Sequence, residues 1–185
     1  MARPPDPRAQ RSRERMFAAL VALIHERGWD KVSVREVCAR AGVGRSTFYV
    51  HFADKEELLI GGLTLVRDAM RGRGRRSATR PFGFVPELVA HADGSRRLVR
   101  AVIGKRAGLA VQRRFRELVR ELVHEELPAH QVPAARREAT ARFLAGALVE
   151  LLMGWVDTRG VQSAADVEAT FAQLAIPVLA TARAR

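Results

Sequence analysis

The sequence has few of the residues that form disulfides and no segment suited to crossing a membrane. Cys38 is the only cysteine among 185 residues, so no disulfide can form within the chain and nothing indicates an oxidising compartment. The longest apolar run, residues 145–156, is shorter than a membrane span and is interrupted by Glu150. Residues 1–15 lack the apolar segment of a secretory signal. These absences predict a cytoplasmic protein that does not bind a membrane.

Lysine is also scarce, yet the chain is strongly basic. Lys31, Lys55 and Lys105 are the only lysines, although 32 Lys and Arg residues stand against 20 Asp and Glu, for a net charge of +12. Such an excess favours a polyanionic partner, with nucleic acid ahead of an anionic membrane surface. A hydrophobic content of 48% is enough to build a core and argues against a disordered chain.

The residue patterns of common enzyme sites are missing. Lys105 follows a glycine, but Val99 and Arg106 occupy positions where a phosphate-binding loop needs Gly and Ser or Thr. His124 and His130 are too far apart to form one helical zinc face, and Pro128 lies between them. We therefore predict a non-enzymatic protein with no catalytic residues, no cofactor and no metal site.

No stretch alternates polar and apolar residues as a strand does, and apolar residues instead recur at three- and four-residue spacing. This periodicity predicts an all-α protein. After a flexible basic arm over residues 1–10, the expected helices cover residues 11–27, 34–41, 45–51, 55–70, 85–92, 95–102, 107–127, 133–158 and 164–182.

The second and third expected helices form a recognisable motif. Ser33 and Glu36 form a capping box, Gly42 suits a left-handed cap, and a two-residue turn leads to residues 45–51. Two short helices joined by a tight glycine turn indicate a helix-turn-helix, whose second helix enters the major groove of DNA. Phe48 and Phe52 are four residues apart and are expected to face inward. The polar residues between them are then left to contact phosphates and base edges.

The stretch SVREVCARAGVGRSTFYVHFADKEELL resembles the DNA-binding head of the tetracycline-repressor (TetR) family of bacterial transcriptional regulators. The resemblance covers about residues 11–63 and includes the turn, the aromatic block and the start of the fourth helix. One departure is Gly44, which stands where the family usually has a capping residue. The resemblance implies a helix-turn-helix domain over residues 11–55 and a ligand-binding and dimerisation domain over residues 56–185.

The same resemblance implies specific DNA contacts. Ser33 would cap the second helix and approach the DNA backbone. The phosphates would be bound by Thr47, Tyr49 and Lys55, and the residues at or near the bases would be Arg45, Ser46 and His51.

The C-terminal half shows two wide apolar stripes, which one chain of this length cannot bury together with all its other helices. A four-helix bundle formed by two copies would bury them, so we predict a homodimer. The expected interface residues are Leu148, Leu151, Leu152, Trp155, Phe171, Leu174 and Val178.

Between the head and these stripes lies a set of mostly apolar residues. Family resemblance implies that an unknown small-molecule effector, largely apolar, binds among them. The candidates are Val66, Met70, Phe82, Phe84, Leu88, His91, Val102, Phe115 and Leu118. The function predicted is therefore a repressor that leaves its double-stranded operator DNA when this ligand binds. The alternative is a non-specific, basic architectural protein.

Gly61 and Gly62 lie inside the fourth expected helix, where glycine is unfavourable. Two explanations are open: the helix bends there, or a neighbouring helix approaches too closely for a side chain.

Overall fold

Every regular element is helical in the part of the chain that the computed structural model describes, which comprises residues 7–73, 81–103, 108–128, 131–158 and 162–183. The predicted all-α class is confirmed.

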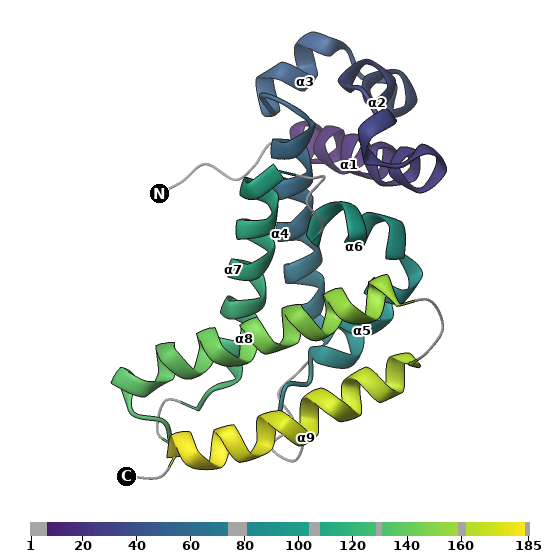
Figure 1. Cartoon of the computed structure of the whole chain (residues 1–185). Coiled ribbons are helices and arrows are strands. Elements are labelled where there is room, and N and C mark those ends of the chain that lie inside the picture. Colours follow the sequence, from purple (N-terminus) through teal and green to yellow (C-terminus); the bar gives the residue numbers. More distant parts are fainter. Residues whose placement is uncertain (1–6, 74–80, 104–107, 129–130, 159–161, 184–185) are drawn as a thin grey trace, which may run out of the picture.

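The helices form two regions joined by one continuous helix (Figure 1). The head lies at one end, and α4 runs from it into the body beside α7. The helices α8 and α9 lie side by side at the opposite end. In chain order the elements are α1 (Pro7–Arg27), η1 (Trp29–Lys31), α2 (Val34–Ala41), α3 (Arg45–His51), α4 (Lys55–Arg73), α5 (Val85–Gly94), α6 (Arg96–Ile103), α7 (Gly108–Glu126), α8 (Ala134–Asp157) and α9 (Ala164–Arg183).

One predicted boundary is wrong. Helix α1 already begins at Pro7, so residues 7–10 of the expected flexible arm are helical. Proline is favourable at the first helical position, where its missing N–H is not needed. The side chain of Gln10 also donates to Glu14 at 2.8 Å, one helical turn further on.

The head is held together by local caps and a shared core. Ser33 accepts from the backbone N–H of Glu36 at 3.3 Å, and the Glu36 carboxylate accepts from the Ser33 N–H at 3.0 Å, which completes the capping box. Gly42 adopts the left-handed conformation with a φ of 61° and ends α2. Asp54 caps α4 by accepting from the Glu57 N–H at 2.8 Å. These caps agree with the sequence prediction.

Arginines of the short helix α6 contact both α1 in the head and α8 in the body. Arg97 of α6 donates to the carbonyl of His25 in the last turn of α1. Arg100 donates to the Val156 carbonyl at 2.5 Å, and Arg96 donates to the Trp155 carbonyl at 3.4 Å, both in the last turn of α8. Carbonyls at a helix C-terminus lack partners within the helix, so these arginines link the head and α8 through α6.

Candidate nucleic-acid interface and adjoining cavities

Helix α3 presents polar and aromatic side chains on its outer face. Phe48 is fully buried and its ring lies 5.8 Å from that of Phe52, so these two side chains fix α3 to the head as predicted. Between them, Tyr49 is 58% exposed and Val50 is 78% exposed. The Tyr49 ring packs edge-on against Phe48 with 5.5 Å between the ring centres, but Tyr49 and Val50 are both mainly exposed and are therefore accessible to another molecule.

The other residues predicted to contact DNA surround this surface. Arg45 and Ser46 are exposed, and Thr47 and His51 are partly exposed on the same helix. Ser33 is exposed at the start of α2, where its hydroxyl is already bonded to Glu36 at 2.7 Å. Hydrogen bonding from Ser33 lowers the pKa of Glu36, so the capping carboxylate is charged at neutral pH.

Lys55 stands at the start of α4 as predicted, and its side chain also bonds within the head. Its ammonium group donates to the carbonyls of Trp29 and Val32, each at 2.9 Å, and lies 4.4 Å from the centre of the Trp29 ring. Burial lowers the pKa of Lys55. Two of the three N–H donors are therefore used within the head, and one is left for a phosphate.

Two smaller features of the head also follow from its packing. Gly44 provides no side-chain cap for α3, as its identity predicts. Cys38 is 4% exposed, and burial raises the pKa of its thiol, which therefore stays neutral and packs as a small apolar group.

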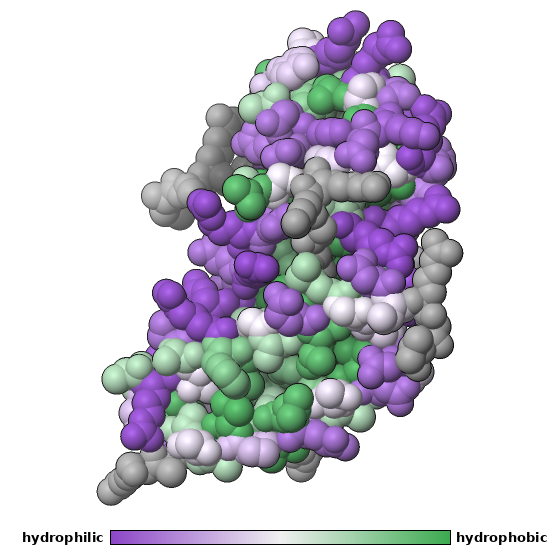
Figure 2. All heavy atoms as spheres, viewed as in Figure 1, coloured by the Kyte–Doolittle hydropathy of each residue, from purple (hydrophilic) through white to green (hydrophobic). Residues whose placement is uncertain are grey.

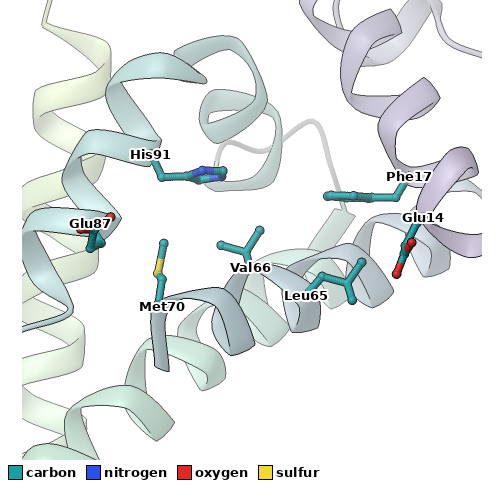
Figure 3. A pocket seen from close by; sticks show the side chains of 7 residues that line it. All are labelled: Glu14, Phe17, Leu65, Val66, Met70, Glu87 and His91. Atoms are coloured by element: carbon teal, nitrogen blue, oxygen red, sulfur yellow. The ribbon is translucent and has the colours of Figure 1, made fainter. Parts of the chain in front are cut away.

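Behind the head, α1, α4 and α5 line an outer cavity of about 410 Å³ that is open to solvent (Figure 3). Three of the predicted ligand-binding residues line it: Val66, Met70 and His91. Burial of the His91 ring among its neighbours lowers its pKa, so the imidazole is neutral at neutral pH even though the cavity leaves it accessible. Four further lining residues were not predicted, and these are Glu14, Phe17, Leu65 and Glu87.

A second, inner cavity of about 40 Å³ adjoins the first and is almost wholly apolar. Its walls include the predicted residues Val66, Leu88, His91, Phe115 and Leu118. Phe82 and Phe84, which were also predicted to bind the ligand, line neither of these two cavities. Both are buried in the core, and the Phe82 ring packs edge-on against Phe171 at 5.5 Å. The side chain of Val102 lies outside the described residues.

The far end of the body exposes apolar side chains (Figure 2). Phe143 of α8 is 63% exposed and Leu174 of α9 is 61% exposed, and Leu151 and Val178 are partly exposed beside them. The interface prediction is corrected for four residues that are buried within the protomer and have no surface left for a partner: Leu148, Leu152, Trp155 and Phe171. The apolar residues of α8 also make it the one described helix that could span a membrane by length and composition. Half of that segment, however, is buried in the protein, as in an ordinary core helix.

A capped helix-turn-helix on an all-helical body defines a DNA-binding transcriptional regulator. Comparison with known proteins agrees, because residues 17–61 match the model of the bacterial regulatory proteins of the tetR family. The DNA-binding head is therefore of the tetR-family type.

Solved structures share the fold over nearly the whole chain. A tetR-family transcriptional regulator from Streptomyces coelicolor is 20% identical with a TM-score of 0.70, covering 94% of this chain and 82% of the other. Thermus thermophilus FadR, a TetR family transcriptional repressor in complex with lauroyl-CoA, is 19% identical with a TM-score of 0.69, covering 94% and 95%. The dihydroxyacetone kinase operon activator DhaS is 16% identical with a TM-score of 0.63, covering 92% and 96%.

Proposed function

We propose that the chain is a homodimeric cytoplasmic repressor that binds a specific operator through α3 and leaves it when an apolar small molecule fills the cavities behind the head. The observation that carries this proposal is the outer face of α3. Its hydroxyls and guanidinium have no role in the protomer's own core, and the exposed Tyr49 ring contacts that core through Phe48, while Phe48 and Phe52 hold the helix beneath them. Residues 11–55 then act as the DNA-binding domain and residues 56–185 as the ligand-binding and dimerisation domain.

Each outer side chain has a chemical role at the DNA. Thr47 and Tyr49 donate hydroxyl hydrogen bonds to phosphates. Ser33 adds a contact to the backbone of the DNA if its hydroxyl turns from Glu36 to a phosphate. Arg45 is suited to the two acceptors of a guanine in the major groove, with Ser46 and His51 near the bases. Lys55 adds positive charge and its one remaining N–H.

The exposed apolar face of α8 and α9 favours the homodimer. Phe143, Leu151, Leu174 and Val178 would be covered by the same residues of a second copy, which forms a four-helix interface. Two heads related by a two-fold axis would bind half-sites about 34–36 Å apart, or a multiple of that distance.

An apolar ligand is favoured by the walls of the inner cavity and by the neutral His91. The FadR structure with lauroyl-CoA supports the idea that a protein of this fold accommodates a long apolar group. We propose repression because a protein that leaves its operator when a ligand binds would then allow the regulated genes to be expressed. DhaS is an activator of similar fold, so activation is the alternative to repression that must be tested.

The test is selection of DNA fragments from a random pool by the pure protein, followed by binding to the selected sequence in competition with bulk DNA at physiological salt. We expect a sequence with two-fold symmetry and a specificity of at least about 10³ over bulk DNA. Equal binding to selected and bulk DNA would instead establish the basic architectural protein. A reporter gene with the selected site placed over its promoter then distinguishes repression from activation.

A further inference from the structure

The two cavities share three wall residues that come from three different helices. Phe17, Val66 and His91 belong to α1, α4 and α5 and line both the outer and the inner cavity. In Figure 3 the rings of Phe17 and His91 point from opposite sides into the space above Val66. Any molecule that extends from the outer cavity toward the inner one must pass between these side chains.

Phe17 is the only one of these three that belongs to the DNA-binding head. Its neighbours on α1, Met16 and Leu20, are fully buried in the core, where α1 packs against α2. The head therefore contributes directly to the wall of the cavity. A force on the Phe17 ring acts on the same helix that supports the helix-turn-helix.

The Phe17 ring is held in place by a glycine. A Cβ atom built on Gly62 would lie 1.7 Å from Cε2 of Phe17, so the ring fills the space that any other side chain at position 62 would occupy. The ring is thus packed directly against the backbone of α4, so moving the ring away from Gly62 changes the contact between α1 and α4.

The inner cavity is too small to receive a ligand as it stands. It measures about 40 Å³, whereas ligand sites usually measure about 300–1,000 Å³. A ligand that extends inward must displace one of the shared walls. Of the three, Phe17 is the one whose displacement moves the head, because it belongs to α1 and packs against Gly62 of α4; turning of the accessible His91 alone would leave the head in place.

We propose that Phe17 couples the cavity to the DNA-binding head: an apolar ligand that enters between Phe17, Val66 and His91 displaces the Phe17 ring from Gly62 and shifts α1 with the head. This inference rests on the proposed function, because it names the residue through which ligand binding weakens operator binding. Leu65 provides a matched control, since it lines the outer cavity but not the inner one and belongs to α4.

The probe is N-phenyl-1-naphthylamine, a neutral apolar dye whose fluorescence increases in apolar surroundings. Operator affinity of the full chain is measured with and without saturating dye for the wild type, Phe17→Leu and Leu65→Ala. We expect the dye to weaken operator binding by the wild type at least about fivefold, within the usual range of coupling between sites. Phe17→Leu should still bind the dye, but adding the dye should change the operator affinity of this variant less than about twofold. Leu65→Ala should change the dye affinity and keep the wild-type coupling.

A second variant does not depend on removing the ring. Gly62→Ala pushes the ring away from α4, so it should weaken operator binding in the absence of dye and respond less when the dye is added. Circular dichroism at the assay temperature shows whether each variant is folded.

The outcomes separate the inference from the proposed function. If the dye weakens operator binding by Phe17→Leu and by Gly62→Ala as much as by the wild type, the role of Phe17 is overturned and the proposed function still holds. Dye that does not bind, or that binds without weakening operator binding, overturns both the role of Phe17 and release by a ligand in these cavities. If the wild type without dye shows no sequence-specific DNA binding, the proposed function itself is overturned.

Discussion

The two adjacent glycines of α4 should respond in opposite directions to the same substitution. At Gly62, alanine places a methyl group 1.7 Å from the Phe17 ring. An ordinary contact begins near 3.4 Å, so the ring and α4 must separate by about 1.7 Å, which is the difference between the two distances. At Gly61 the nearest atom is Cε1 of Phe52 at 3.3 Å, which requires almost no movement.

The magnitudes follow from two opposing effects. Replacing glycine by alanine in a helix interior stabilises the protein by about 1 kcal/mol. Forcing a methyl group into a filled site costs about 1–3 kcal/mol, and the rigid ring places Gly62→Ala near the upper value. Gly62→Ala should therefore lower the free energy of unfolding by about 2 kcal/mol, and Gly61→Ala should raise it by up to about 1 kcal/mol.

The assay is urea unfolding followed by circular dichroism, with all variants at one protein concentration because dimers gain stability with concentration. In a Phe17→Ala background the ring is gone, so adding Gly62→Ala should stabilise instead of destabilise. A gain in stability for Gly62→Ala in the wild-type background would refute this packing account. It would also restore the view that the glycines allow α4 to bend.

Four further predictions concern the DNA and dimer surfaces. Tyr49→Phe should weaken operator binding by about 1.5 kcal/mol without changing stability, because only a hydroxyl donor to a phosphate is lost; fluorescence anisotropy measures it, and unchanged affinity rejects the contact. Arg45→Ala should reduce discrimination at one base pair by about 1–3 kcal/mol, tested on operators with each pair changed. Lys55→Met should lower the free energy of unfolding by about 1–3 kcal/mol, because the Trp29 and Val32 carbonyls lose their donor; an unaltered urea midpoint would contradict it. Phe143→Asp should give folded monomers in sedimentation, and a dimer of wild-type strength would move the interface elsewhere.

Features that depend on neighbouring residues could be predicted from the sequence. The capping box at Ser33, the left-handed Gly42 and the Asp54 cap all involve residues within a few positions of one another. The same holds for Phe48 and Phe52, whose four-residue spacing places both rings on the inner face of α3. The caps and the inward-facing rings of the head could therefore be predicted.

Features that depend on which helices meet could not be predicted. The stripe on α8 is wide enough to face both its own chain and a partner, and periodicity cannot tell Leu152, which is buried, from Phe143, which is exposed. Lys55 resembles a phosphate ligand by position, yet carbonyls more than 20 residues earlier in the chain accept its hydrogen bonds. Phe17 reads as an ordinary core residue, because its role depends on the distant Gly62.

The arginines of α6 have a consequence for local unfolding. An isolated helix of eight residues is too short to be stable in water, where about 12–15 residues are needed. The helical state of α6 thus depends on its packing against the body and on its contacts with the ends of α1 and α8, and losing one of these end contacts should increase the solvent access of its backbone amides. Hydrogen exchange in α6 would then increase whenever the head shifts relative to the body. Those few amides would report the state of the whole protein without any label on the DNA or the ligand.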